Sequence, residues 1–215
     1  MSRMEVVTVP GKDAVGELKR LRGLSAATGL YPILFGEEPL EGSGPTPEEI
    51  TNILRRSEEI NLARWLSDRP DPDPEILENE NLDWSEAEAI ELVTHLDIRT
   101  NRPLPKVFIG RLKLNAPCEA FAHLGYGGWN DCPAPEEHVA LHRSWEARFG
   151  AQVVSITSDI VQCAVERPPT TREACLALAR EHYAYCYDIV EQGTETIPAL
   201  AAGLRNARYW YFWWD

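Results

Sequence analysis

Cys132 and His138 come nearest, among the residues of this chain, to a nucleophilic pair in type and spacing. Cys132 lies in a glycine-rich stretch, Gly125 to Pro133, just before a predicted helix, and a helix N-terminus lowers the pKa of a thiol. A thiolate beside a histidine is the arrangement used in covalent catalysis. No oxyanion motif or orienting carboxylate stands nearby in the sequence, so we expect Cys132 to be a packed thiol instead.

Two pairs of potential metal ligands recur at helical spacing. His138 and His142 lie four residues apart on one predicted helix, and His182 and Cys186 lie four apart on another. Residues at i and i+4 share a helix face, so two such pairs facing each other would supply four ligands for zinc. Both pairs also border apolar stripes, where a histidine is usually a hydrogen-bonded packing residue. We therefore expect no metal and no cofactor.

A third possibility is a polar pocket where the glycine-rich loop meets a later turn. Carboxylates and amides from the two segments would converge there and could perform acid–base chemistry or bind a cation. The candidate residues are Trp129, Asn130, Asp131, Cys132, Asp188, Glu191 and Gln192. The same side chains are typical of turns and helix caps, which is the structural alternative. The loop is no phosphate-binding loop, because no Lys-Ser or Lys-Thr follows its glycines.

Five apolar stretches predict the strands that would position these residues. They cover residues 31–35, 106–114, 151–157, 160–165 and 209–214. The third and fourth are joined by Ser158-Asp159, which predicts a hairpin. The last is almost entirely aromatic, so we expect it to be buried on both faces or covered by the rest of the chain. Helices are predicted at residues 12–28, 135–149 and 198–206, and after a capping box at 170–173.

Residues 37–105 read as an acidic, mainly helical insertion. A capping box at Thr46 to Glu49, with Pro47 at the first helical position, predicts a helix that runs to about Leu66. A second capping box at residues 85–88 predicts another helix that ends near His95. Residues 1–36 form an N-terminal helix–strand flank, and residues 106–215 form the core of what we expect to be a single domain.

The net charge of −13 is concentrated in this insertion. Residues 37–105 carry eighteen acidic and six basic side chains, a net charge of −12, against +2 before them and −3 after them. Nucleic acid is an improbable partner, because phosphate binding requires a basic surface. A basic protein is the more natural partner, and the alternative is a face that only keeps the protein in solution.

Two further features concern location. No run of about 18 apolar residues exists and the N-terminus lacks the pattern of a signal peptide, so we expect no membrane association. The five cysteines are an odd number without the spacing of a disulfide framework, which fits reduced thiols. We expect a cytoplasmic protein.

Several motifs in the second half of the chain, taken together, resemble a known family. They are Gly127-Gly128-Trp129-Asn130, Pro133, Trp145, Arg148-Phe149-Gly150-Ala151, Arg167-Pro168-Pro169, Tyr185-Cys186-Tyr187-Asp188, Val190, Gln192-Gly193 and the run Trp210 to Asp215. The set resembles DUF4253, a bacterial domain family of unknown function, over about residues 105–215. Tyr31-Pro32 and the helix before it resemble the N-terminal flank of longer members, whereas residues 37–105 have no counterpart in the pattern. The resemblance implies a fold unit and carries over no catalytic residue.

These observations predict an α+β fold with a central mixed sheet of about five strands, flanked by helices and carrying the acidic insertion. The leading functional hypothesis is a cytosolic bacterial protein-binding module, of an immunity-type or regulatory kind, that docks a basic partner through its acidic face. The alternative is an enzyme or small-ligand-binding protein that uses the predicted pocket between the Trp129–Cys132 loop and the Asp188–Gln192 segment. The sequence leans against catalysis, because no convincing catalytic set is present.

Overall fold

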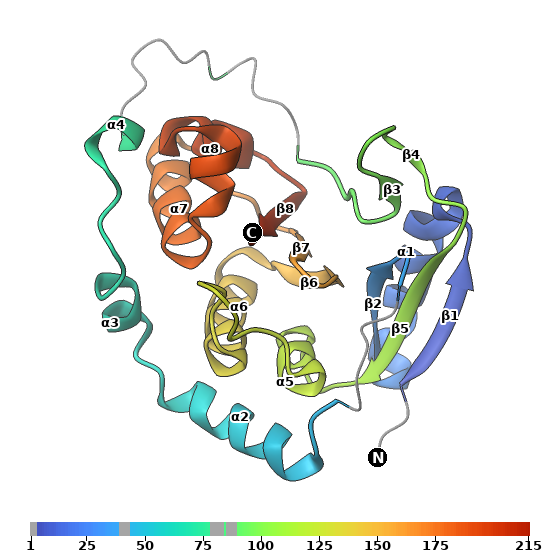
Figure 1. The fold of residues 1–215 in the computed structure, drawn as a ribbon. Coiled ribbons are helices and arrows are strands. Elements are labelled where there is room, and N and C mark those ends of the chain that lie inside the picture. Colours follow the sequence, from blue (N-terminus) through green and yellow to red (C-terminus); the bar gives the residue numbers. More distant parts are fainter. Residues whose placement is uncertain (1–3, 39–43, 78–83, 85–89) are drawn as a thin grey trace.

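A computed structural model describes residues 4–38, 44–77, 84 and 90–215, which are built around a six-stranded mixed sheet (Figure 1). The strands lie in the order β1 (Glu5–Val9), β5 (Val107–Lys113), β2 (Leu30–Gly36), β6 (Gln152–Ile156), β7 (Ile160–Ala164) and β8 (Tyr209–Trp213). Neighbouring strands are antiparallel except β2 and β6, which are parallel with Leu34 opposite Ser155. The sheet and its helices confirm the predicted α+β class, and β6 and β7 form the predicted hairpin.

The N-terminal residues contribute the middle of the sheet and one of its edges. Strand β2 lies between β5 and β6, so residues 30–36 are central and not a flank. Strand β1 was not predicted. It is an edge strand whose side chains are mostly exposed, and its short sequence from Glu5 to Val9 has no clean apolar alternation. The predicted five strands therefore become six.

Helix α1 (Gly11–Thr28) covers one face of the sheet. Its residues Ala14, Leu18 and Leu21 recur at helical spacing and pack in one buried cluster with Leu34, Ile109 and Val154 of the sheet. The helix ends at Gly29, whose φ of 67° is left-handed, as the sequence predicted. At its start, Gly11 donates its N–H to Leu104 at 2.9 Å, and a Cβ there would lie 2.6 Å from the Leu104 carbonyl oxygen.

The other face carries a larger core beneath four helices: α5 (Ala120–Leu124), α6 (Pro135–Phe149), α7 (Arg172–Tyr185) and α8 (Ile197–Leu204). A 3₁₀ turn (Pro117–Glu119) precedes α5, and a π-helical turn (Val190–Thr194) precedes α8. Trp145 of α6 is fully buried and stacks on Phe212 of β8, with ring centroids 5.6 Å apart. Trp210 lies edge-on to Trp145 at 5.8 Å. Aromatic packing therefore joins the C-terminal strand to the middle helix.

The ends of α6 and α7 follow their predicted signals. Pro135 occupies the first turn of α6, where its missing N–H is not needed, and Gly150 ends the helix with φ 62°. Thr171 caps α7 by accepting the N–H of Ala174 at 3.3 Å.

Three further helices run along the outside of α6, α7 and α8: α2 (Pro47–Glu59), α3 (Leu62–Ser67) and α4 (Pro74–Leu77) (Figure 1). The capping box at Thr46 is confirmed, but the single helix predicted to reach Leu66 is wrong. Ile60 is extended, and the Asn61 side chain accepts the N–H of Arg64 to begin α3. An asparagine that caps a new helix therefore divides the predicted one.

The helix predicted to end near His95 is wrong where the chain is described. Its capping box at 85–88 lies outside the described residues, and residues 90–95 are not helical. Gln162 of β7 is buried, and its Oε1 accepts the backbone N–H groups of Val93 at 2.9 Å and Thr94 at 3.3 Å, while its Nε2 donates to the Glu91 carbonyl at 2.8 Å. These bonds hold the segment against β7 in a non-helical conformation, because they replace the partners that a helix would supply.

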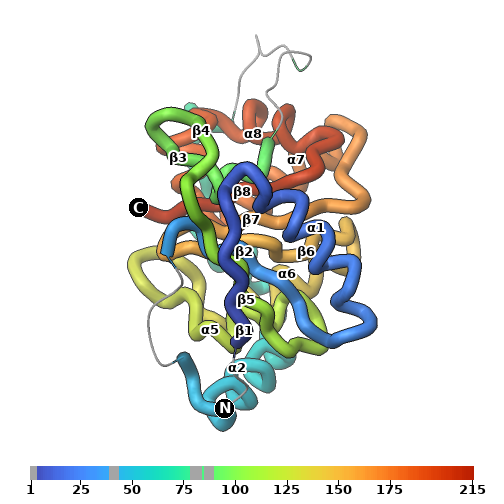
Figure 2. The backbone as a smooth tube through the Cα atoms, turned by 90° about the vertical axis from the view of Figure 1, so that its right-hand side faces the viewer, coloured from blue at the N-terminus to red at the C-terminus, as the bar shows by residue number. Residues whose placement is uncertain are grey.

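A short hairpin of β3 (Leu96–Asp97) and β4 (Arg102–Pro103) follows this segment. Figure 2 shows it at the end of the molecule opposite to α2, and Figure 1 agrees. Strand β8 alternates, with Trp210 and Phe212 fully buried but Tyr211 and Trp213 half-buried, so the expectation of burial on both faces is wrong. An edge strand has less chain to cover its second face. No helix in the described part of the chain has the length and apolar character needed to cross a membrane.

Candidate functional site

The glycine-rich loop at residues 125–133 is shaped by contacts that leave no room for side chains. Gly127 has a φ of 112°, and a Cβ there would lie 2.1 Å from the carbonyl oxygen of Pro133 and 2.8 Å from the His138 ring. Gly128 donates its N–H to the Pro133 carbonyl at 2.9 Å. Glycine at 127 therefore allows the loop to close tightly over the start of α6.

The loop meets the turn after α7 around Asp215. Tyr187 donates its hydroxyl to Asp131 at 2.5 Å. Asn130 donates its side-chain amide to the backbone carbonyl of Asp215 at 2.7 Å, and the N–H of Asp215 is donated to Asp188 at 3.2 Å. The hydrogen bond to Asp131 raises the pKa of Tyr187 to about 12, so its hydroxyl is a donor at neutral pH. The structure thus brings Asn130, Asp131 and Asp188 together.

The other predicted pocket residues are engaged by their neighbours. Gln192 donates to the second carboxylate oxygen of Asp188 at 2.9 Å, and Glu191 accepts the hydroxyl of Tyr183 at 2.8 Å. Trp129 is half-buried against the larger core. The loop and the turn therefore form a polar cluster in which most side chains already satisfy one another.

Cys132 and His138 do meet, with Sγ 3.4 Å from Nε2. Burial raises the pKa of the Cys132 thiol. Burial, and then the neighbouring His142, lower the pKa of His138 well below its usual value. Both shifts oppose transfer of the thiol proton to the imidazole, so the pair is a neutral thiol beside a neutral imidazole.

Tyr185 connects this pair to a second histidine. Its hydroxyl lies 2.6 Å from Nδ1 of His138 and 2.9 Å from Nε2 of His142. The Nδ1 atom of His142 lies 3.5 Å from Sγ of Cys163 on β7. Side chains from the loop, α6, α7 and β7 therefore form one buried series of hydrogen bonds. We call it the histidine–tyrosine chain; its members are Cys132, His138, Tyr185, His142 and Cys163.

The direction of the histidine–tyrosine chain depends on which nitrogen of each ring carries the proton. With the proton of His138 on Nε2, its Nδ1 accepts the hydroxyl proton of Tyr185, the Tyr185 oxygen accepts Nε2–H of His142, and Nδ1 of His142 accepts the thiol proton of Cys163. With the proton of His138 on Nδ1, every one of these bonds runs in the opposite direction. Burial lowers the pKa of His142 to about 3 and also lowers that of His138, and it raises the pKa values of Tyr185 and the two thiols, so all five groups are neutral at neutral pH.

His182 and Cys186, the second predicted ligand pair, are held by other contacts. The His182 ring lies 5.0 Å from Trp145 and 4.7 Å from Trp210, measured between centroids. The Cys186 thiol donates to the carbonyl of Trp213 at 2.9 Å. Among the residues that the structure describes, no group of three or more His, Cys, Asp and Glu side chains is placed to hold a metal ion.

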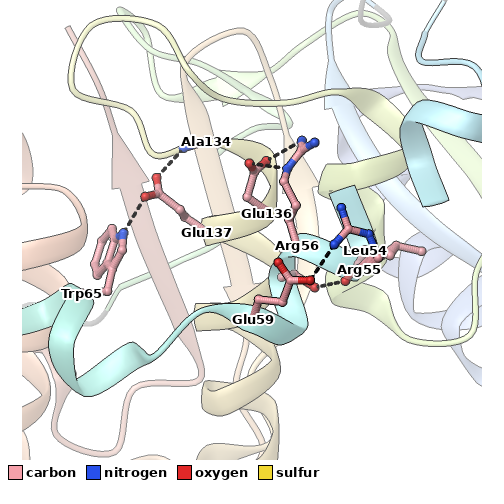
Figure 3. Close-up of polar contacts among 9 residues, drawn as sticks. Leu54, Arg55, Arg56, Glu59, Trp65, Ala134, Glu136 and Glu137 are labelled. Carbon is pink, nitrogen blue, oxygen red and sulfur yellow. Dashed lines mark hydrogen bonds and ion pairs between the residues drawn. The ribbon is translucent and has the colours of Figure 1, made fainter. Parts of the chain in front are cut away.

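Two of the outer helices, α2 and α3, are bonded to the start of α6 (Figure 3). Arg56 of α2 donates to Glu136 at 2.8 and 3.3 Å. The Trp65 indole of α3 donates to one oxygen of Glu137 at 2.7 Å, and the other oxygen accepts the N–H of Ala134 at 2.7 Å. One carboxylate therefore caps α6 and holds α3 against it.

Two cavities lie apart from the polar cluster. The smaller, about 580 Å³, has Lys19, Arg205, Arg208 and Glu91 in its lining. The larger, about 1370 Å³, lies where β2 and β6 end, beside the β3–β4 hairpin. None of the seven predicted pocket residues lines either cavity.

Three residues hold several others in place, and the sequence did not predict this role for them: Tyr185, Cys163 and Gln162. Tyr185 and Cys163 stand on different elements from the α6 histidines, so no local spacing in the sequence connects them. Gln162 did carry a signal, because it is a lone amide within the apolar run from Ile160 to Val165. A buried amide in a strand needs a partner, and here that partner is the backbone of residues 91–94.

Comparison with protein families gives one match, over the second half of the chain. The matching family is described as "Domain of unknown function (DUF4253)", and its model covers residues 108–215. This region contains the glycine-rich loop, the whole histidine–tyrosine chain and strands β6 to β8. No curated protein and no solved structure matches the chain.

Proposed function

The chain belongs to the DUF4253 family, and we propose that it is a protein-binding module that docks a basic partner through the acidic surface of α2, α3 and α4. We further propose an immunity-type or regulatory role in the bacterial cytoplasm. The five cysteines support a reducing compartment, since all are buried free thiols.

The observation that carries the proposal is the unequal use of charge on these helices. All four arginines of residues 47–77 pair with carboxylates of the same chain: Arg55, Arg56, Arg64 and Arg69. Six exposed carboxylates of the same residues form no ion pair with any described residue: Glu48, Glu49, Glu58, Asp71, Asp73 and Glu75. The unpaired carboxylates of this surface are therefore free to contact a basic partner, whereas its arginines are already paired within the chain.

The attachment of α2 and α3 to α6 also supports the proposed docking surface. Arg56 and Trp65 tie α2 and α3 to α6, and Arg69 lies 3.8 Å over the Trp65 ring. Ser57 also accepts from Arg143 of α6 at 3.2 Å. A charged surface held on a rigid helix loses less conformational entropy on binding than a free segment does.

The test is capture of a partner from a lysate of the source cell, followed by titration with the purified partner. We expect a basic partner whose affinity falls about tenfold or more when salt rises from about 50 to 300 mM. A variant with Asp71→Asn, Asp73→Asn and Glu75→Gln should bind at least about tenfold more weakly, because surface charge steers and holds the complex. The matched control, Asp13→Asn, Glu173→Gln and Glu195→Gln, should bind normally. A partner that is not basic, or equal binding by both variants, would refute the proposal.

A small-ligand or enzymatic function is the second candidate, favoured by one observation: the loop and the turn do converge, with Asp131, Asp188 and Asn130 around Asp215. Its test is the pair of changes Asp131→Asn and Asp188→Asn in a screen of small cationic ligands by thermal shift. Stabilisation of the parent chain that both variants lose would favour this candidate. Absence of any ligand-dependent shift would leave the carboxylates as structural groups.

A further inference from the structure

The larger cavity is a groove at one end of the sheet. Strands β2 and β6 are parallel neighbours and finish at the same end, where Gly36 and Glu37 follow β2 and Thr157 to Ile160 follow β6. The β3–β4 hairpin forms one side, from Leu96 to Asn101. Crevices outside the carboxyl ends of parallel strands are where open α/β sheets bind ligands.

The lining of the groove combines negative charge with apolar surface. Among the described residues that line it are five carboxylates and a single guanidinium, that of Arg99; the carboxylates are Glu37, Glu38, Glu91, Asp97 and Asp159. The apolar members include Leu96, Ile160 and Ile189, together with Ile98. Ile98 is 90% exposed at the tip of the hairpin, beside Leu96, so its side chain extends the apolar part of the lining.

Hydrogen bonds among the described residues hold the walls of the groove in place. Gln162 fixes residues 91–94, and Thr94 also hydrogen-bonds to Gln162 through its hydroxyl at 2.9 Å. Asp97 accepts from the backbone and hydroxyl of Thr100, both at 2.8 Å, which fixes the hairpin turn. Asp159 accepts the indole N–H of Trp213 at 3.2 Å. The groove is therefore preformed, which reduces the entropy lost on binding.

We propose that this groove binds an extended segment of another protein in which lysine or arginine alternates with aliphatic side chains. A volume of about 1370 Å³ exceeds the roughly 300–1000 Å³ typical of small-molecule pockets, so a chain segment fits it better. Alternate side chains of an extended peptide point to opposite sides. Cations on one side would face the carboxylates, and aliphatic groups on the other would cover Ile98 and Leu96.

This inference does not depend on the docking surface of α2 to α4, because the groove is lined by other residues. Helix α2 lies at the opposite end of the molecule from the hairpin (Figures 1 and 2). Either site can fail while the other stands. The two can be separated by asking which backbone amides respond to a defined peptide.

The experiment titrates the ¹⁵N-labelled full chain with a peptide of about ten residues that alternates Lys and Val. We expect amide shifts at residues 96–101 and 157–160 and a Kd that weakens about tenfold or more between about 50 and 300 mM salt. Peptides with Glu in place of Lys, or Ser in place of Val, should bind at least about tenfold more weakly, because each removes one of the two complementary features.

The variant Glu37→Gln, Glu38→Gln, Ile98→Ser changes three exposed side chains and should weaken binding of the Lys–Val peptide about tenfold or more. Its matched control is Glu166→Gln, Glu173→Gln, Leu24→Ser, which removes the same groups from neither of the two proposed surfaces and should bind normally. No shift in the groove overturns the inference. Shifts confined to α2–α4, or equal binding of the Lys–Ser peptide, also overturn it, and the first of these would favour the proposed docking surface instead.

Discussion

The histidine–tyrosine chain and the outer helices both carry many polar groups, and they hold them in opposite ways. In the histidine–tyrosine chain, five buried and neutral side chains each bond to the next inside the core. On α2 to α4, charged side chains pair at the surface, where water screens them. A buried group that loses its partner costs far more free energy than an exposed pair does. The first region therefore governs stability, and the second offers its charge to partners.

Acidification should reveal the largest difference between the two regions, because the buried histidines make the free energy of unfolding depend on pH. Burial lowers the pKa of His138, His142 and His182 below the ordinary value of 6.5, so the unfolded chain takes up protons first as the pH falls. Their stabilising contribution is complete above about pH 7 and is lost progressively below about pH 6.5, down to about pH 3 for His142. At about 1.4 kcal/mol per pH unit for each histidine, the free energy of unfolding should fall by about 4 kcal/mol between pH 7 and 5.5.

Urea unfolding at several pH values measures this dependence. The change His182→Phe should reduce it by about one third, because it removes one of the three buried histidines. His123→Gln, at a half-buried site on α5, should reduce it less. A free energy of unfolding that does not change over this range would contradict the assignment of neutral, buried imidazoles.

Tyr185→Phe tests the histidine–tyrosine chain directly. It removes the hydroxyl between His138 and His142 and leaves two buried ring nitrogens without their partner, at an expected cost of about 3 kcal/mol in the free energy of unfolding. Tyr187→Phe is the matched control, because its hydroxyl bonds to Asp131 at the surface, and we expect a loss below about 1 kcal/mol. Equal losses in the two variants would remove the distinction between buried and exposed networks.

Gln162→Leu should free the segment that lines the groove. The change leaves the N–H groups of Val93 and Thr94 and the carbonyl of Glu91 without their side-chain partner, which should cost about 2 kcal/mol. Amide hydrogen exchange at Val93 should accelerate well before global unfolding. Gln152→Leu, on the neighbouring strand, should leave that exchange unchanged. Normal protection of Val93 in Gln162→Leu would show that other contacts hold the segment.

Trp65→Phe should have the smallest effect on stability apart from the control Tyr187→Phe. It removes the half-exposed hydrogen bond to Glu137 and should lower stability by only about 1 kcal/mol. Limited proteolysis should nevertheless cut sooner near residues 66–77, because α3 loses its main polar attachment to α6. A rate of cleavage equal to that of the parent chain would place the attachment in the apolar contacts instead.

The parts of the fold that sequence could predict are those with local causes. Helix ends at Gly29, Thr46 and Gly150 depend on backbone angles or caps within a few residues, and the structure has them where the sequence indicates. The helix predicted for residues 90–95 is wrong because Gln162, some seventy positions later, accepts the N–H groups of Val93 and Thr94. The edge strand β1 was not predicted because its side chains are mostly exposed, and an exposed strand lacks the apolar pattern on which strand prediction depends.

The candidate site divides in the same manner. The contact of Cys132 with His138 follows from six residues of chain that reverse at a glycine-rich loop. The convergence of Asn130 and Asp188 was a hypothesis about long-range packing, and the role of Asp215 between them could not be inferred from spacing. The joining of both α6 histidines by Tyr185 also needed the tertiary structure, since α6 and α7 are separated by a β-hairpin.

The histidine–tyrosine chain also has a consequence for the time scale on which protons leave the interior. The hydroxyl proton of Tyr185 and the ring proton of His142 lie on side chains that are 2% and 1% exposed, so they reach water only when the surrounding elements part. Their exchange with solvent should report one event that separates α6, α7 and β7 together. If the hydroxyl resonance of Tyr185 is visible in proton NMR at neutral pH, its rate of exchange with water would measure how often that opening occurs.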